Sequence, residues 1–182
     1  MNSNVITRRY DRTFDLLDHD GNGVLEEKDF TGLTEAIARA TGVPQGSAKE
    51  ETLLKEWRNC WHTLLELADA NGDGEISREE FQQAMAEAYG DHAKLKERLT
   101  PGLEASFAAI DADDDEVATV EQYEVYLTAW GLEPAQARAA RGLLDADGDG
   151  RFTCQEFVNG WTEFLLGEDA EGSVGALLGP LN

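Results

Sequence analysis

Two stretches of the sequence decide the fold: Asp69-Ala70-Asn71-Gly72-Asp73-Gly74, followed by Glu80, and Asp145-Ala146-Asp147-Gly148-Asp149-Gly150, followed by Glu156. In each, an oxygen-bearing side chain stands at positions 1, 3 and 5, glycine at position 6 and glutamate at position 12. A hard cation such as Ca²⁺ takes about six to eight oxygen ligands. A short loop supplies them only by curling around the ion, and the glycine permits the sharp bend. The pattern therefore predicts calcium-binding loops at residues 69–80 and 145–156.

Each predicted loop offers the same kinds of ligand, which are the side chains at positions 1, 3, 5 and 12 and the backbone carbonyl at position 7. The predicted ligands are Asp69, Asn71, Asp73, the carbonyl of Glu75, and Glu80 in one loop, and Asp145, Asp147, Asp149, the carbonyl of Arg151, and Glu156 in the other.

The same pattern recurs along the chain. Acidic clusters begin at Asp18, Asp69, Asp111 and Asp145, and an aromatic residue follows each first aspartate by twelve positions, at Phe30, Phe81, Tyr123 and Phe157. Apolar residues at helical spacing flank the clusters, whereas the alternation typical of strands is absent from the sequence. The sequence therefore predicts an all-α fold of four helix-loop-helix units.

The first loop, residues 18–29, is nearly complete. It keeps Asp18, Asp20, Asn22 and the carbonyl of Val24, but it ends in Asp29 where glutamate is expected. Aspartate is one methylene shorter and reaches an ion less easily with both oxygens. We therefore expect this loop to bind metal with weaker calcium selectivity and to favour the smaller Mg²⁺.

The third loop, residues 111–122, departs further from the pattern. Glu116 replaces the glycine at the bend, and Gln122 replaces the final carboxylate. A bend without glycine is strained, and an amide offers one neutral oxygen where two charged oxygens are needed. We expect a structural role only, in which Ala118 pairs with Phe152 as Leu25 pairs with Ile76.

The units are expected to form two paired lobes packed into one compact domain. Residues 1–92 hold loops 18–29 and 69–80, residues 93–166 hold loops 111–122 and 145–156, and residues 167–182 form an apolar tail. The tail either folds back into the cleft between the lobes or remains disordered. Breaks are expected at residues 41–46, near Thr100 and Pro101, and at residues 131–134, with Pro101 and Pro134 in the first turns of helices.

Composition excludes several classes of protein. The chain has 37 acidic and 15 basic side chains and a net charge of −22, which opposes nucleic-acid binding. No secretory signal or membrane span is visible in the sequence. The two cysteines, Cys60 and Cys154, do not make a disulfide framework. A monomeric protein in the cytoplasm is expected.

With two complete loop motifs, the chain resembles a four-unit EF-hand protein across residues 5 to 166. Its size and the long gap between the first two loops are similar to the sarcoplasmic calcium-binding proteins and the related calerythrin type. The resemblance implies a calcium buffer or transport protein that binds about three divalent cations in loops 1, 2 and 4. Catalysis is not expected.

Two other functions share the motifs. A calcium sensor opens a groove for a target helix, and such grooves favour methionine; this chain has only Met1 and Met85. A photoprotein would use a set of aromatic and histidine side chains, but no histidine follows His92. The four tryptophans, at positions 57, 61, 130 and 161, either line a ligand cavity or form the core, and their helical spacing favours the core. Whether a protein target exists is left open.

Overall fold

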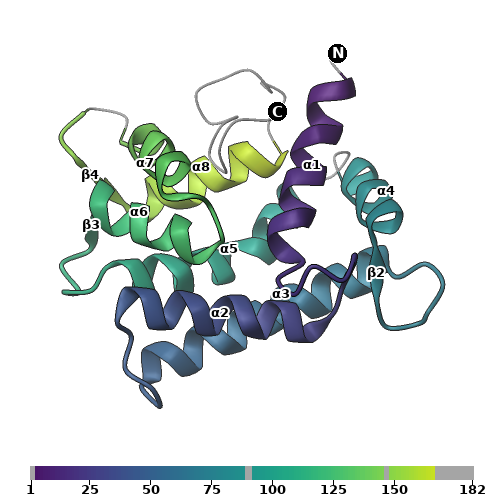
Figure 1. The fold of residues 1–182 in the computed structure, drawn as a ribbon, viewed down its shortest axis with the longest axis horizontal. Helices are drawn as coiled ribbons and strands as arrows, with labels where there is room; N and C mark the ends of the chain where they lie inside the picture. Colours follow the sequence, from purple (N-terminus) through teal and green to yellow (C-terminus); the bar gives the residue numbers. More distant parts are fainter. Residues whose placement is uncertain (1–2, 89–91, 146–147, 167–182) are drawn as a thin grey trace.

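The structure is a computed structural model that describes residues 3–88, 92–145 and 148–166 (Figure 1). The helices are α1 (Ser3–Leu17), α2 (Glu27–Thr41), α3 (Ala48–Ala68), α4 (Arg78–Ala88), α5 (His92–Ile110), α6 (Val120–Ala129), α7 (Pro134–Ala140) and α8 (Cys154–Leu166), with a 3-10 turn, η1, at Arg141–Leu143. The strands are β1 (Val24–Leu25), β2 (Ile76–Ser77), β3 (Val117–Thr119) and β4 (Arg151–Thr153). The predicted all-α fold is confirmed.

The strands join the loops in pairs. The first and second loops meet through an antiparallel ladder in which Leu25 lies opposite Ile76. The third and fourth loops meet through a second ladder that places Ala118 opposite Phe152. Both predicted pairings are confirmed. These four side chains are at most 1% exposed, so each ladder holds two loops together through one buried pair of apolar side chains.

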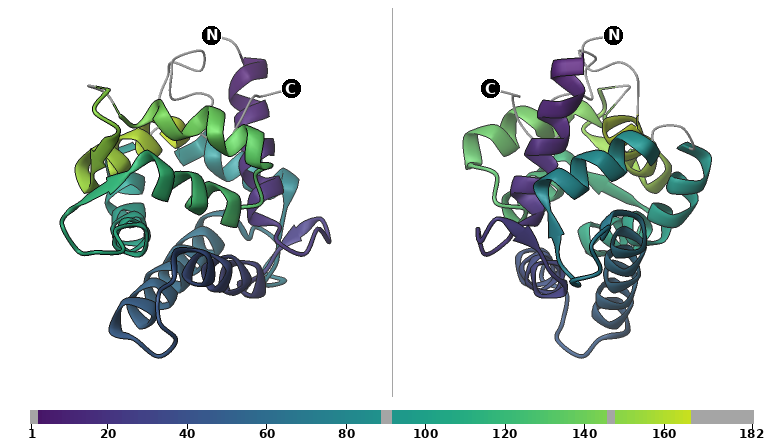
Figure 2. Two further views of the ribbon diagram at one scale, coloured as in Figure 1. Left: turned by 60° about the vertical axis from the view of Figure 1, so that its left-hand side comes forward. Right: turned by 90° about the vertical axis from the view of Figure 1, so that its right-hand side faces the viewer.

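Apolar helix faces hold the first two units against the last two. Helix α3 packs along α5, and α2 packs against α6 (Figures 1 and 2). The ring of Trp57 in α3 lies 5.4 Å from that of Trp130, which in turn lies 5.2 Å from Trp161 in α8. With Trp61, these tryptophans are at most 7% exposed. The tryptophans are therefore core residues, as their spacing indicated.

Two of the predicted breaks are confirmed. Gly42 ends α2 in a left-handed conformation, with φ 76°, and Pro134 occupies the first turn of α7. Glycine adopts this conformation without the cost that a side chain imposes.

The predicted break near Thr100 and Pro101 is wrong, because α5 continues through Pro101. Proline inside a helix costs about 3 kcal/mol through its missing N–H group and its ring. Packing explains why the helix continues. A Cβ at Gly102 would lie 2.6 Å from the Cys60 sulfur, so α5 approaches α3 too closely to leave room for a side chain. The long apolar contact between these helices offsets the local cost.

An apolar cavity of about 100 Å³ lies where the two halves meet. Phe30, Trp57, Phe81, Met85 and Trp161 contribute to its wall. The tail predicted to fill this cleft, residues 167–182, lies outside the described residues. None of the helices in the described part of the chain combines the length and apolar composition that crossing a membrane requires.

Candidate metal centres

In every loop the first aspartate organises the backbone. Its carboxylate accepts N–H groups from residues three to five positions further on. The donors are Asn22 and Gly23 to Asp18, Gly72 and Gly74 to Asp69, Asp115 and Glu116 to Asp111, and Gly148, Asp149 and Gly150 to Asp145. Such turns are local and form from short polar side chains. The curled shape of the loops is therefore built by the chain itself.

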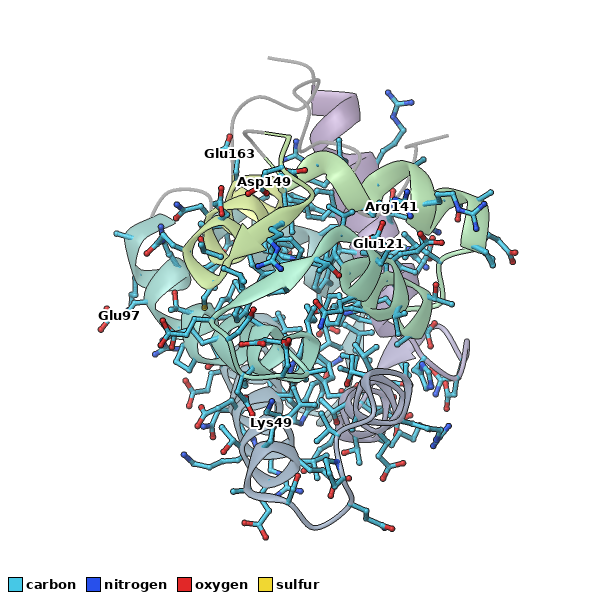
Figure 3. All side chains as sticks on the ribbon, turned by 90° about the vertical axis from the view of Figure 1, so that its left-hand side faces the viewer. Lys49, Glu97, Glu121, Arg141, Asp149 and Glu163 are labelled. Atoms are coloured by element: carbon cyan, nitrogen blue, oxygen red, sulfur yellow. The ribbon has the colours of Figure 1, made fainter. Side chains whose placement is uncertain are left out.

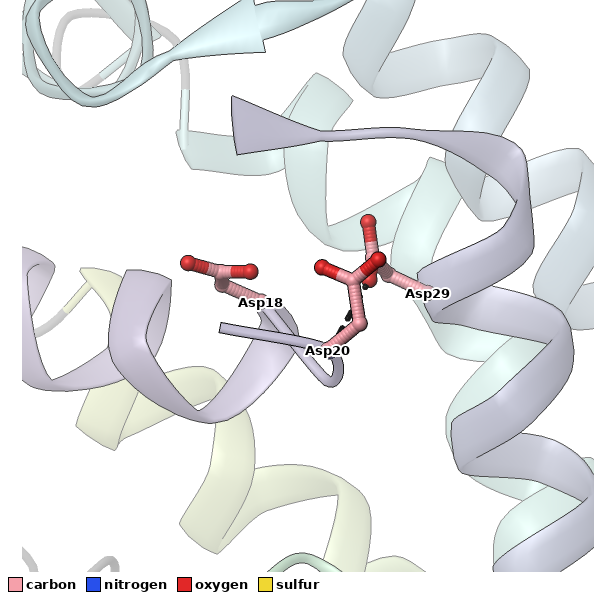
Figure 4. Close-up of side chains that lie close together, drawn as sticks. All are labelled: Asp18, Asp20 and Asp29. Carbon is pink, nitrogen blue, oxygen red and sulfur yellow. Dashed lines mark hydrogen bonds between the residues drawn. The ribbon is translucent and has the colours of Figure 1, made fainter. Parts of the chain in front are cut away.

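The first loop gathers three carboxylates. One oxygen each from Asp18, Asp20 and Asp29 lies within 4.8 Å of the others (Figure 4). Asp29 is 1% exposed, and it accepts the backbone N–H groups of Asp20 at 3.3 Å and Glu26 at 2.8 Å. Burial raises the pKa of Asp29, while these two hydrogen bonds oppose the rise. The short side chain at position 12 therefore does reach the cluster. The carbonyl of Val24, proposed at position 7, belongs to β1.

Two further side chains of the first loop, Glu26 and Lys28, contact its predicted ligands, although the loop pattern does not predict either as a ligand. Glu26, at position 9, accepts the amide of Asn22 at 2.9 Å and the ammonium of Lys28 at 2.5 Å. The same ammonium lies 3.0 Å from Asp20. Lys28 lowers the pKa of both carboxylates, and they raise its own pKa. In the sequence, the acid at position 9 followed by the base at position 11 is the pattern that indicates this ion pair.

The second loop has its predicted ligands on one turn, but they do not converge. Asn71 accepts the N–H of Asp73, and Asp73 accepts that of Glu75, which directly precedes β2. Glu80 accepts both the N–H of Ser77 at 2.9 Å and its hydroxyl at 2.7 Å, and the backbone bond is the main reason its pKa is lowered. The acids of residues 69–80, all within the described part of the chain, form no triad of the kind found in the first loop.

The fourth loop repeats this arrangement. Asp149 accepts the N–H of Arg151, which begins β4. Glu156 accepts the N–H of Thr153 at 2.8 Å and its hydroxyl at 2.9 Å. Asp147 lies outside the described residues. In both complete loops, the position-12 glutamate begins the following helix by capping its first turn.

The third loop keeps the shape of the others although it lacks the glycine at position 6 and the glutamate at position 12. Asp114 and Glu116 adopt left-handed conformations, with φ of 57° and 70°, so the bend forms without glycine. Left-handed backbone costs a non-glycine residue about 1–2 kcal/mol. Gln122 caps α6 by accepting the N–H of Thr119 at 2.7 Å. Asp111, Asp113 and Asp115 bring their oxygens within 4.8 Å of one another, a grouping that the sequence did not predict.

Basic side chains from other units contact this third loop. The ammonium of Lys49, near the start of α3, donates to the carbonyl of Asp111 at 2.9 Å and to Asp114 at 2.7 Å (Figure 3). Arg151 in β4 lies 3.8 Å from Asp115. These cations lower the negative charge of the loop without any metal.

The donor sets fit a hard divalent cation. The proposed side-chain ligands are carboxylates and amide oxygens, which suit Ca²⁺ and Mg²⁺ and are poor partners for softer metals. His19, at position 2 of the first loop, lies against Gly32 of α2 instead of joining the acidic oxygens. Two like charges about 4 Å apart repel by about 1 kcal/mol in water. A bound cation removes this repulsion, so the clusters favour cation uptake.

Known proteins that resemble this chain bind calcium, which agrees with the oxygen-rich loops. Residues 8–86 match the family described as an EF-hand domain pair. A calcium-binding protein from Streptomyces coelicolor, described as acting in prokaryotic calcium-mediated regulation, shares 32% identity, with a TM-score of 0.82 over 88% of this chain and 98% of that one. Calerythrin from Saccharopolyspora erythraea is 27% identical over 92% of this chain and 96% of its own. The beta chain of the sarcoplasmic calcium-binding protein from Penaeus is 26% identical over 91% of each chain.

Proposed function

The chain belongs to the EF-hand family of calcium-binding proteins, of the calerythrin and sarcoplasmic type, and from this premise we propose that it is a monomeric, cytoplasmic calcium buffer without catalytic activity. Its first, second and fourth loops bind the ions. The observation that carries this proposal is that each of these loops combines a first aspartate that accepts backbone N–H groups and so curls the loop with a carboxylate at position 12, which the third loop lacks. Binding therefore needs side-chain rotation more than refolding.

In the second loop the proposed ligands are Asp69, Asn71, Asp73, the carbonyl of Glu75, and Glu80; in the fourth they are Asp145, Asp147, Asp149, the carbonyl of Arg151, and Glu156. Glu80 and Glu156 must rotate away from the hydroxyls of Ser77 and Thr153 to offer both oxygens.

In the first loop the proposed ligands are Asp18, Asp20, Asn22, the carbonyl of Val24, and Asp29. The close grouping of its acids and the short Asp29 side chain support occupation by Mg²⁺ as well as Ca²⁺, because the smaller ion requires shorter contacts and fewer protein ligands. Nucleic acid is not a partner of so acidic a chain.

The third loop is proposed to be structural. Gln122 lacks the charged pair of oxygens at position 12, and Lys49 and Arg151 already offset part of the charge. The structural role of the third loop is to hold the fourth loop in register through the ladder between β3 and β4.

A calcium titration by calorimetry, with the metal content of the loaded protein measured independently, tests this assignment. Binding at loops 1, 2 and 4, with no binding at loop 3, is expected. The variant Gln122→Ala should retain the full stoichiometry, whereas Glu80→Ala should lose one tight site. A fourth bound Ca²⁺ that disappears in Gln122→Ala would contradict the structural role of the third loop.

The alternative is a calcium sensor, which the regulatory role described for the Streptomyces coelicolor protein favours. The described core supports the buffer instead. Met85 is 7% exposed and Trp57, Trp130 and Trp161 pack on one another, so the apolar faces of the halves are already covered. Sensors expose a methionine-rich groove.

Fluorescence of a hydrophobic dye separates the two functions. For a buffer, the signal should fall or stay constant when calcium is added to the metal-free protein. Deletion of residues 168–182 should raise the signal if this apolar tail covers the cavity. A large calcium-induced increase in the intact chain, together with calcium-dependent capture of an amphipathic helix, would establish the sensor.

A further inference from the structure

Among the four loops, only the first has a basic residue next to its position-12 ligand. Position 11 is Lys28 in this loop, and it is Glu79, Glu121 and Gln155 in the others. Only the first loop also has an acid at position 9, where the others have Ser77, Thr119 and Thr153. Position 9, Glu26, is the N-cap residue of α2, and position 11, Lys28, lies in the first turn of that helix.

The structure shows what this pair does. The Lys28 ammonium lies between Asp20, at 3.0 Å, and Glu26, at 2.5 Å, and thus joins positions 3 and 9 of the loop. The amide group of Asn22 points the same way, donating to Glu26 at 2.9 Å and to Asp20 at 3.4 Å. Oxygens of Asp20 and Glu26, at positions 3 and 9, are therefore bound by donors belonging to the loop itself.

We propose that Lys28 is a resident cation of the first loop, which a divalent ion must displace, and that it makes this loop bind more weakly than the second and fourth. The proposal rests on the proposed function, in that the first loop binds metal. Uptake requires the ammonium to leave Asp20 and the Asn22 amide to turn its oxygen inward. In the second and fourth loops, Asp69, Asp145, Glu80 and Glu156 accept backbone N–H groups, and the two glutamates also accept hydroxyls.

The size of the effect is limited by exposure. The Lys28 side chain is 54% exposed and Asp20 is 43% exposed, so water and salt screen the ion pairs. Removing the ammonium should strengthen binding to the first loop by about fivefold, the upper range for a weak surface interaction. The gain should shrink as sodium chloride is added.

The test isolates the first loop in a chain carrying Glu80→Gln and Glu156→Gln, which remove a required ligand from the other two sites. Calcium is then titrated calorimetrically into this background, with Lys28→Met, and with Lys96→Met as the matched control. Lys96 loses the same charge, but its ammonium lies near Asn159 at 3.5 Å and not in a loop. Lys28→Met should raise the association constant about fivefold, while Lys96→Met should change it less than about twofold.

Asp29→Asn in the same background distinguishes failure of the inference from failure of the proposed function. If Asp29→Asn abolishes the heat but Lys28→Met has no effect, or no more effect than Lys96→Met, the first loop binds metal and the role of Lys28 is wrong. If the background shows no heat, or if the heat survives Asp29→Asn, the first loop is not a metal site and both proposals fail.

A second measurement does not depend on binding heat. In chelator, Lys28→Met should melt below Lys96→Met, because the first-loop acids lose their internal cation. In millimolar calcium the two variants should melt together, since the divalent ion has then replaced the ammonium. Equal melting temperatures in chelator would overturn the proposal.

Discussion

Replacement of Glu156 by glutamine should remove a calcium site while leaving the metal-free fold nearly unchanged, and the chain contains its own comparison. The side-chain oxygen of Gln122 accepts the backbone N–H of Thr119 at 2.7 Å, and the backbone N–H of Gln122 donates to the Thr119 hydroxyl at 3.2 Å. Glu156 makes the same reciprocal contacts with Thr153, at 2.8 and 3.3 Å. Glutamine at position 12 therefore still caps the helix. The lost charge at the helix N-terminus costs about 0.3–1 kcal/mol.

Calcium should reveal a much larger difference. At a free concentration about a thousandfold above the dissociation constant, one site adds about 4 kcal/mol of stability, which is about 10 °C in melting temperature for a chain of this size. The Glu156→Gln variant should lose this increment, whereas Glu163→Gln, which removes an exposed charge from the same helix (Figure 3), should retain it. Calorimetric melting in chelator and in millimolar calcium measures both quantities. An undiminished calcium shift would refute the ligand role of Glu156, and a collapse of the metal-free variant would refute the capping argument.

Three further predictions concern the intact loops and the core. The wild-type protein should melt at a lower temperature in chelator than in millimolar calcium, and added salt should raise the chelator value by screening the loop carboxylates; equal values in both media would be inconsistent with cation-relieved repulsion. Glu116→Gly should stabilise the metal-free protein by up to about 1 kcal/mol in urea unfolding, because glycine adopts the left-handed conformation at this position without strain. The control Gln83→Gly, inside α4, should instead destabilise the protein by about 1 kcal/mol. Destabilisation by both variants would argue against strain in the third loop. Burial raises the pKa of Cys60 to about 12. Iodoacetamide should therefore label the less buried Cys154 first at neutral pH in the folded protein, as measured by mass spectrometry. Faster labelling of Cys60 would contradict its burial.

The loops were predictable because each is closed by contacts between near neighbours. The first aspartate bonds to backbone groups three to five residues away, and the position-12 side chain caps the helix that follows it. The aromatic residue after each loop is buried in the core, as its helical register indicated. Even the pairing of Leu25 with Ile76 could be inferred, since a repeated unit presents the same position to its partner.

Several features depended on distant parts of the chain. The contact of Lys49 with Asp114 joins residues 65 positions apart, and no local pattern in either segment announces it. The third loop lacks the bend glycine, yet Asp111 closes it on nearby N–H groups as in the other loops, and its ladder with β4 and the contact from α3 add long-range support that the sequence did not predict.

By itself the sequence determined the helix-loop-helix units, the four loops and the oxygen-rich donor sets, because these follow from spacings of twelve residues or fewer, and the repetition of the unit indicated how the loops pair. The tertiary structure alone decided that α5 runs through Pro101, where close packing of Gly102 on α3 outweighs a local penalty. It also decided that Lys49, near the start of α3, reaches Asp114 in the third loop. The physical reason is that spacing sets which groups are near one another along a turn, whereas the packing of whole helices and the balance of many weak side-chain contacts set the helix ends and rotamers.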